Sequence, residues 1–334
     1  MNTRVRLLVF AAGAAVFFFL VQHVGPAVLL ANIRRAGWTL APIVLLWVPV
    51  FLCWNASWWL TMRGAANPPP FWRVLVVGIA GHSINEVTPF AQVGGEPFRV
   101  AAMSPWLGVD RATSSVVTYY MLHALTNMAI WVAGILLVIA HYHPPLALRV
   151  PLVALAAAIA ALMAFVLARH RQGVVTPLVD LVRRIPVLRR FALPLEQRRP
   201  QLETLDRLIT GFYHESPSRF ALAFLADLIG RGLSTLEYWF MGRGLGVDVS
   251  LVQAFAIGSF GALAINLVFF MPMQAGTKEG GLYFAFRLVG LDAKLGVFAA
   301  VFQRLRELTW IAIGLVLILV AGERETLRKS RAEG

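Results

Sequence analysis

Long hydrophobic runs without a single charged residue dominate this sequence. Residues 7–33, 38–62, 112–140 and 150–168 contain no Asp, Glu, Lys or Arg. A helix needs about 20 residues to cross the hydrocarbon core of a bilayer. The runs also lack the alternation of polar and apolar positions that a membrane β-strand requires. The pattern therefore predicts an all-α integral membrane protein.

About six segments are expected to span the membrane completely. The first follows Arg4 and Arg6 and is predicted to be a membrane helix, because it is too long for a signal peptide and no small-residue cleavage site follows it. The six expected spans are residues 7–24, 39–62, 112–140, 150–168, 220–242 and 303–321.

Two further hydrophobic stretches, 71–104 and 252–290, are each interrupted in the middle. In both, Ile-Asn is followed by Pro, Gln and Gly, and then by a Glu seven residues beyond the proline. The prolines lie 183 positions apart, at 89 and 272, and the glutamates at 96 and 279 are separated by the same interval. Proline removes a backbone donor and glycine permits positive φ, so each stretch is expected to form a re-entrant helical hairpin. The expected hinge residues are Pro89, Gly94, Gly95, Pro272, Gly276 and Gly280.

A simpler interpretation of these two stretches stays open. Proline and glycine also end ordinary short helices, and the chain contains 18 Pro and 27 Gly, so the match between the two stretches is then a coincidence. Mapping which side of the membrane residues near 105 and 245 occupy separates the two interpretations.

The distribution of basic residues predicts the topology in a bacterial inner membrane. Residues 169–219 hold ten Arg against five acidic residues, and residues 324–331 hold three Arg and one Lys. Because basic loops stay on the cytoplasmic side, this loop and both termini are expected there. The hairpin in 71–104 then enters from the cytoplasm and the hairpin in 252–290 from the periplasm. The expected organisation is an inverted repeat of two membrane halves, 1–168 and 220–334, joined by the basic cytoplasmic loop 169–219.

Composition narrows the possible chemistry. The net charge is +13, but most of the charge lies between apolar spans, so topology explains it and no nucleic-acid partner is expected. Cys53 is the only cysteine, which excludes an intramolecular disulfide and a cysteine-built metal site. The sequence contains no Walker loop, dinucleotide fingerprint or hydrolase elbow. We therefore expect no cofactor, no metal and no catalytic residue.

Charged residues at membrane depth cost about 2.5–3.5 kcal/mol each on insertion scales, so they usually face a cavity or a partner. We expect Arg99, Lys278 and Arg304 to bind an anionic head group, assisted by free N–H groups of the half-helices. Amides nearby either bind substrate or satisfy freed backbone groups; these are Asn85, Gln92 and Gln274. The acidic residues expected to carry protons or to balance the cations are Glu86, Glu96 and Glu279.

A structural interpretation competes with this one, since Glu96 and Arg99 are three positions apart and form an ion pair if they face each other. Asp227 and Arg231, four apart, are likewise expected to pair within the span 220–242. His82 and His123 are expected to be packing or hydrogen-bonding residues.

The broken segments resemble a known family. The features that carry the resemblance are Thr-Pro at 88–89, Gly-Gly-Glu-Pro-x-Arg at 94–99, Pro272, Gly-x-x-Glu-Gly-Gly at 276–281, and Arg304. They are similar to the flippase-like family that includes the membrane region of lysylphosphatidylglycerol synthase and the hopanoid-biosynthesis-associated membrane proteins. Lys278 and the Phe-Phe pair at 269–270 do not match the family pattern.

This resemblance implies a transporter that moves a lipid between leaflets or towards export, with a membrane lipid as its substrate and lipid-biosynthesis proteins as potential partners. Synthase activity is not implied, because the chain lacks the cytosolic domain that makes the aminoacylated lipid. Two alternatives remain: an integral-membrane enzyme that modifies a lipid head group, and a scaffold for a lipid-synthesis complex.

Overall fold

The computed structural model describes residues 37–88, 94–169, 199–267 and 276–333, together with seven single positions between 22 and 180. Within these ranges the chain is helical and contains no β-strand, as the sequence predicts. The elements are η1 (Gly37–Thr39), α3 (Leu40–Met62), α4 (Phe71–Val87), α5 (Gly95–Leu107), α6 (Val109–Tyr142), α7 (Leu146–Arg169), α10 (Arg199–Glu215), α11 (Pro217–Thr235), α12 (Glu237–Gly244), α13 (Leu251–Leu267), α14 (Thr277–Leu288) and α15 (Lys294–Glu333).

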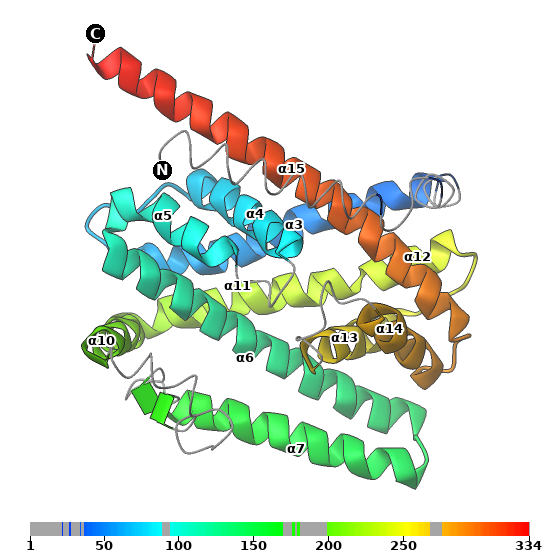
Figure 1. The fold of residues 1–334 in the computed structure, drawn as a ribbon. Coiled ribbons are helices and arrows are strands. Elements are labelled where there is room, and N and C mark those ends of the chain that lie inside the picture. The colour runs from blue at the N-terminus through cyan, green and yellow to red at the C-terminus, as the bar shows by residue number, and fades with distance from the viewer. Residues whose placement is uncertain are drawn as a thin grey trace.

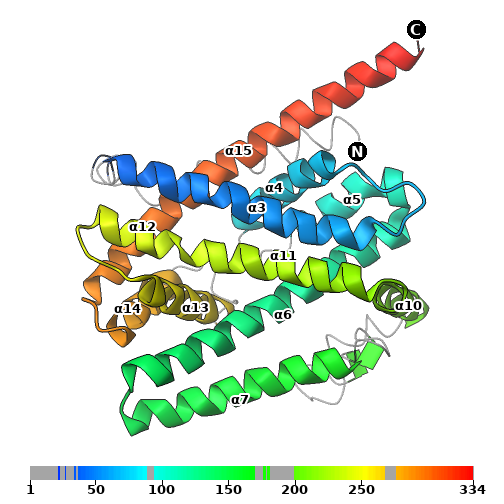
Figure 2. The ribbon, with the colours of Figure 1, turned by 180° about the vertical axis from the view of Figure 1, so that it is seen from behind.

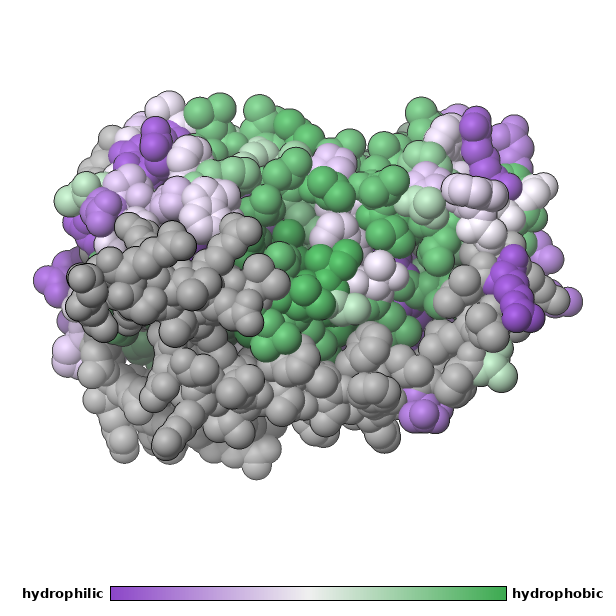
Figure 3. Space-filling model, turned by 90° about the horizontal axis from the view of Figure 1, so that it is seen from above, coloured by the Kyte–Doolittle hydropathy of each residue, from purple (hydrophilic) through white to green (hydrophobic). Residues whose placement is uncertain are grey.

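Three helical segments in the described part of the chain are long and apolar enough to cross a membrane, namely Gly37–Met62, Val109–Tyr142 and Leu146–Ala168. They confirm three of the six expected spans. α7 buries little of its surface against the protein and exposes large apolar side chains such as Val150 and Leu162. Viewed from above, the described surface is hydrophobic across its middle and hydrophilic at both ends (Figure 3). That arrangement suits a helix bundle surrounded by lipid.

The remaining expected spans differ from the structure or lie outside it. Residues 7–24 are not among the described residues. The predicted span 220–242 is divided into α11 and α12 at Leu236, where the backbone makes a tight turn and Leu236 donates to the carbonyl of Leu233 at 3.0 Å. The predicted span 303–321 is the central part of α15, which extends from Lys294 to Glu333.

Each of the two broken segments folds as a pair of helices. α4 and α5 pack against each other, as do α13 and α14. α4 ends at Val87 and α5 begins at Gly95, while α13 ends at Leu267 and α14 begins at Thr277; residues 89–93 and 268–275 lie outside the described residues. Pro89, Gln92, Pro272 and Gln274 lie outside the described residues, so their expected roles at the tips remain predictions.

The helices of the two halves correspond in order and in contacts. The series α3, α4, α5, α6 matches α11 with α12, α13, α14, α15, at close to the 183-residue interval seen in the sequence. α3 packs along α11, while α4 packs on α15 and α13 packs on α6. Each half therefore places its broken helix pair against the long helix of the other half.

The two broken pairs open toward opposite ends of the molecule. The connections on either side of α4 and α5 lie at the end where α10 is found, and those flanking α13 and α14 lie at the far end (Figures 1 and 2). α6 and α15 run the length of the molecule in opposing chain directions (Figure 1).

Small residues allow these helices to approach closely, a common feature of membrane helix packing. A Cβ on Gly314 of α15 would lie 1.9 Å from the hydroxyl of Ser83 on α4, and Ser83 donates to the carbonyl of Trp310 at 3.0 Å. At the corresponding crossing, a Cβ on Gly134 of α6 would lie 2.4 Å from Ser259 of α13. The two crossings bring both broken pairs to the centre of the molecule.

Candidate functional site

A cavity of about 1220 Å³ lies at the centre of the molecule, between the two broken helix pairs. Its wall is formed by α3, α4, α5 and α6 of the first half and by α11 to α15 of the second half. Aromatic and apolar side chains make up much of the lining. The charged residues that line it are Glu86, Glu96, Arg99, Arg231, Glu237, Lys278, Arg306 and Glu307.

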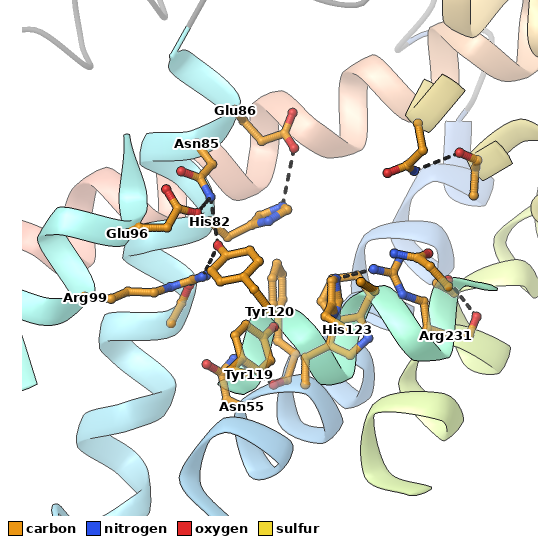
Figure 4. Close-up of a pocket in the computed structure, with 18 of the residues that line it drawn as sticks. Asn55, His82, Asn85, Glu86, Glu96, Arg99, Tyr119, Tyr120, His123 and Arg231 are labelled. Atoms are coloured by element: carbon orange, nitrogen blue, oxygen red, sulfur yellow. Dashed lines mark hydrogen bonds and ion pairs between the residues drawn. The ribbon is translucent and has the colours of Figure 1, made fainter. Parts of the chain in front are cut away.

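Arg99 projects from α5 into one side of this cavity (Figure 4). Its guanidinium contacts the hydroxyl of Tyr120 on α6 and donates to the carbonyl of Gly78 on α4 at 3.1 Å. The rings of Trp58, Tyr119 and Tyr120 surround it at 5.4–5.6 Å, a distance at which cation–π attraction operates. Arg99 is only 5% exposed, and no carboxylate in the described part of the chain forms an ion pair with it.

Gly81 on α4 makes room for the Arg99 side chain. A Cβ on Gly81 would lie 2.6 Å from the Arg99 Nε atom, so an alanine there would displace the guanidinium. Arg99 Nε is buried without a hydrogen-bond partner in the described residues. The absence of a side chain at position 81 therefore provides the space that the Arg99 guanidinium occupies, and the Nε–H of Arg99 remains without an acceptor among the described residues.

Asn85 joins the two helices of the first broken pair. Its side-chain carbonyl accepts from the backbone N–H of Gly95 at 2.5 Å, which satisfies a free donor at the start of α5. Its amide donates to Glu96 at 2.9 Å and to Tyr120 at 3.1 Å. Tyr120 and Asn85 therefore link Arg99 to Glu96. The alternative expectation of a direct Glu96–Arg99 ion pair is not met, because each side chain turns to these partners instead.

His123 of α6 occupies a second polar cluster three positions beyond Tyr120. Its Nδ1 atom lies 2.9 and 3.1 Å from the two carboxylate oxygens of Asp227 on α11, and its Nε2 atom contacts the Arg231 guanidinium. Asp227 is fully buried and also accepts from the hydroxyl of Thr126. The predicted direct pair between Asp227 and Arg231 is thus replaced by a chain in which His123 stands between them.

Arg306 of α15 anchors a third cluster with Glu237 of α12. The Arg306 Nε and a Glu237 oxygen are 3.4 Å apart, and both side chains are at most 5% exposed. Glu237 also accepts from the Trp47 indole at 2.8 Å and from Gln303 at 2.9 Å. The Arg306 guanidinium stacks 3.7 Å from the Trp47 ring centroid. These contacts connect α3, α12 and α15.

Lys278, at the start of α14, is held by Glu307 of α15. Its ammonium donates to both carboxylate oxygens at 2.7 Å. Arg306 contacts the same carboxylate at 3.5 Å. Lys278 lines the cavity as expected, but its charge is already balanced by a direct ion pair.

Glu86 also lines the cavity, and its nearest ion-pairing partner in the described residues is His82, whose Nε2 lies 3.9 Å from the carboxylate. The His82 ring packs against the rings of Phe51 and Trp54 at 5.1 and 6.5 Å. This packing agrees with the role that the sequence predicts for His82.

Glu279 and Arg304 are not part of the cavity wall. Glu279 accepts from the backbone N–H of Gly276 at 3.0 Å, which caps the start of α14. It also pairs with Arg304 at 2.5 Å, and both side chains are partly exposed. The structure therefore separates these two residues from Arg99 and Lys278, with which the sequence groups them.

Of the glycines expected as hinges, only Gly276 has a positive φ, at +78°. Gly94 has a helical φ of −74°, and Gly280 lies within α14 with nothing near the position of a Cβ. Gly95 is required for close approach, since a Cβ there would lie 2.1 Å from the carbonyl oxygen of Gly81.

Several cavity residues escaped the sequence analysis. Tyr119, Tyr120 and Gln303 sit in apolar helices where nothing in the local pattern marks them. The sequence singles out His123 but gives no sign of its partner or of the Arg306–Glu237 pair, because the paired residues are 104 and 69 positions apart. Within the described residues, no group of three potential ligands is placed to hold a metal ion. The site is a polar, aromatic-lined chamber at the centre of a membrane protein.

Comparison with known proteins agrees with this picture. No curated protein and no solved structure shows significant similarity to the chain. Residues 5–316 match the family described as the lysylphosphatidylglycerol synthase TM region. This match covers nearly the whole sequence, including all the helices that line the cavity, and the chain therefore belongs to the lysylphosphatidylglycerol synthase membrane-region family.

Proposed function

We propose that this protein is a lipid transporter that moves a polar-headed lipid, of an anionic or hopanoid type, between the leaflets of a bacterial inner membrane or towards export. The head group occupies the central cavity while its tail stays in the surrounding lipid. Arg99 is the principal anchor. The observation that carries this proposal is a buried guanidinium that lines a cavity of about 1220 Å³ without a direct carboxylate partner among the described residues.

The chemistry of Arg99 favours a phosphate or another anionic group. A charge at membrane depth is costly and is usually retained for a functional partner. The guanidinium presents a planar fork of donors that matches phosphate and carboxylate. Its present partners are a phenol, a backbone carbonyl and aromatic rings, and its Nε has none. An anionic head group gives Arg99 a direct ion pair, whereas its link to Glu96 runs through Tyr120 and Asn85.

The arrangement of the helices supports transport rather than simple binding. Two broken helix pairs that open toward opposite ends and meet at a central site match a recurrent transporter plan. In this proposal the pairs are re-entrant hairpins from opposite faces of the membrane, and rocking of one half against the other exposes the cavity to each side in turn. Lys278 contacts the head group only when its ion pair with Glu307 opens.

Leaflet exchange by the reconstituted full chain tests this function. Vesicles carry a fluorescent phosphatidylglycerol, and a membrane-impermeant quencher reports the fraction in the outer leaflet over time. Losing a charge-assisted hydrogen bond costs about 1.5–3 kcal/mol, so Arg99→Gln is expected to slow exchange about 10–100-fold, since 1.4 kcal/mol is tenfold. Arg99→Lys, which keeps the charge, is expected to lose less.

The matched control is Arg243→Gln. Arg243 is an exposed arginine that stacks on Trp239 of the same helix, with its guanidinium 3.9 Å from the ring centroid. Exchange by this variant should match the unaltered chain. Equal exchange by Arg99→Gln and Arg243→Gln, with both proteins correctly folded, would remove Arg99 from the mechanism.

A second function is favoured by one observation, the hydrogen-bonded pair of His123 and Asp227 beside the cavity. Such a pair is typical of acid–base catalysis, and it suits an enzyme that modifies a lipid head group. Mass spectrometry of the same vesicles distinguishes the two functions. Transport leaves the lipids chemically unchanged, whereas an enzyme alters their mass.

A further inference from the structure

The contacts of His123 determine its protonation state in this structure. An arginine side chain only donates hydrogen bonds and stays charged in proteins. Because Arg231 contacts Nε2, this nitrogen must accept and carries no proton. The proton of the neutral ring is then on Nδ1, which donates to Asp227 at 2.9 Å. His123 is therefore neutral, and a second proton has access to Nε2 only when Arg231 moves away.

Arg231 is held loosely compared with the other cations of the cavity wall. Lys278 and Arg306 form direct ion pairs with carboxylates, but no ion pair of Arg231 is found among the described residues. Its contacts are the neutral His123 ring and the Trp54 ring, 4.9 Å from the guanidinium. Its Nε is buried without a hydrogen-bond partner, although the side chain borders the cavity.

Arg231 lines the same cavity as the proposed anchor, Arg99. Tyr120, which contacts Arg99, and His123, which contacts Arg231, are three positions apart on α6. Residues at this spacing are neighbours on one face of a helix, about one turn apart. The Tyr120 and His123 rings are 6.5 Å apart, and Arg99 and Arg231 line the cavity on either side of them (Figure 4). A phosphate-bearing head group bound at Arg99 therefore shares the cavity with Arg231.

The cations around the cavity already have negative partners, direct or linked, and Glu86 is a further carboxylate without an arginine or lysine partner among the described residues. Lys278 pairs with Glu307, and Arg306 with Glu237. Arg99 is linked to Glu96 through Tyr120 and Asn85, and Arg231 is linked to Asp227 through His123. An incoming anion adds a negative charge for which no spare cation exists. A low-dielectric interior strongly disfavours such an unbalanced charge.

We propose that head-group binding is coupled to the uptake of one proton by His123. This inference rests on the transport function proposed above and concerns the regulation of the same site. The phosphate draws the Arg231 guanidinium away from His123, and a proton released by the acid form of the aqueous buffer bonds to the freed Nε2 atom. The result is two neutral pairs, Arg231 with the phosphate and the His123 imidazolium with Asp227. No covalent bond of the lipid forms or breaks.

Of the other groups near His123, one is a competing proton acceptor. Glu96 already accepts from Asn85, and Tyr119 and Tyr120 are phenols that do not accept a proton near neutral pH. Glu86, on the far side of His82, is the competing acceptor. The titratable or charged groups facing His123 are Asp227 and Arg231 on α11, Tyr119 and Tyr120 on α6, Arg99 on α5 and His82 on α4.

Proton uptake on binding is measured by titration calorimetry of the detergent-solubilised full chain in two buffers with different ionisation enthalpies. The difference between the two apparent enthalpies gives the number of protons bound, as linkage requires. The probes are short-chain phosphatidylglycerol, inorganic phosphate, and a diacylglycerol with the same tails but no phosphate. The expected result is uptake of up to about one proton per phosphatidylglycerol and no uptake with diacylglycerol.

His123→Gln is expected to bind phosphatidylglycerol with proton uptake near zero. The matched control is His141→Gln, which changes an exposed histidine at the end of the same helix. Its proton uptake is expected to equal that of the unaltered chain. Asp227→Asn is a second variant, since it removes the counterion of the imidazolium, and its uptake is also expected to fall. If neither variant folds, the unaltered chain still decides the question.

Phosphatidylglycerol binding by the unaltered chain without proton uptake would overturn the coupling and leave the transport function standing. Uptake that survives in folded His123→Gln but disappears in Glu86→Gln would overturn it in favour of Glu86. Equal uptake with inorganic phosphate would support the coupling and show that the phosphate alone is sufficient. Absence of binding by either phosphate-bearing probe would overturn the coupling together with the proposed lipid site.

Discussion

Lys278 of α14 donates to both carboxylate oxygens of Glu307 on α15, each at a distance of 2.7 Å. Both side chains are largely buried, at 7% and 15% exposure. Removing one member of a buried ion pair leaves an uncompensated charge and costs about 3–5 kcal/mol. The pair therefore joins the second broken helix pair to the long helix that follows it.

Lys278→Met and Glu307→Leu are each expected to lower the thermal unfolding midpoint of the detergent-solubilised protein. The double variant Lys278→Met/Glu307→Leu should recover much of the loss, because apolar residues of similar size replace a buried pair at little net cost. A double-mutant cycle measures the recovery. A double variant whose loss equals the two single losses combined would show that the residues act independently.

Substitution by alanine is expected to change the stability in opposite directions at two glycines of the broken segments, Gly95 and Gly280. Gly95→Ala places a Cβ 2.1 Å from the backbone oxygen of Gly81, and forcing such overlap costs about 1–3 kcal/mol. Gly280→Ala meets no atom within 4 Å, and alanine is favoured over glycine in a helix by about 0.5–1 kcal/mol. Gly95→Ala should lower the unfolding midpoint and Gly280→Ala should raise it.

The same pair of variants tests the hinge role expected for Gly280. A residue that stays helical tolerates alanine, so leaflet exchange by Gly280→Ala should continue at the normal rate. A large loss of exchange in a well-folded Gly280→Ala protein would mean that α14 unwinds at this position during transport.

Helices end close to the interruptions predicted from sequence, at Val87 and at Leu267, although Pro89 and Pro272 themselves lie outside the described residues. Proline and glycine change the backbone wherever they occur, and the 183-residue interval between the two broken segments corresponds to helices that match in order. Three membrane spans could also be predicted, because apolar length and charge patterning are local properties of the sequence. The division at Leu236 was missed because the segment is apolar overall, while Glu237 turns toward Trp47 and Gln303 on distant helices.

The polar partners could not be predicted because they depend on tertiary contacts. Helical spacing suggests that Glu96 pairs with Arg99 and Asp227 with Arg231. In both cases a residue of α6 intervenes, Tyr120 in the first and His123 in the second. Side chains three or four positions apart are neighbours, but a better-placed partner from another helix redirects them. Local spacing identified the charged residues and gave the wrong partners.

Substitution of Glu279 tests whether this residue has a structural role or the proton-coupling role that the sequence suggests. It caps α14 through the backbone of Gly276 and pairs with Arg304, and both side chains are partly exposed. Exposed pairs contribute about 0–1 kcal/mol, so Glu279→Gln should lower the unfolding midpoint only slightly. If the role is structural, leaflet exchange continues at close to the normal rate. If Glu279 carries the coupled proton, exchange is lost in a protein of nearly normal stability.

The placement of the two broken helix pairs in the membrane makes a sharp prediction about accessibility. Asp110 follows the first pair and Asp248 precedes the second, and both are exposed, at opposite ends of the molecule. In the proposed topology Asp110 lies on the cytoplasmic side and Asp248 on the periplasmic side. Because Cys53 is the only cysteine, Cys53→Ala provides a background in which each position is changed to cysteine in turn.

A membrane-impermeant maleimide applied to intact cells should label Asp248→Cys and leave Asp110→Cys unmodified until the membrane is opened. Inside-out vesicles should reverse the result. Labelling of both positions from the same side would mean that the two pairs do not enter from opposite faces, because the helices between them would then return the chain to its starting side. The correspondence between the halves would persist as a packing arrangement, but alternating access between two opposed hairpins would be excluded.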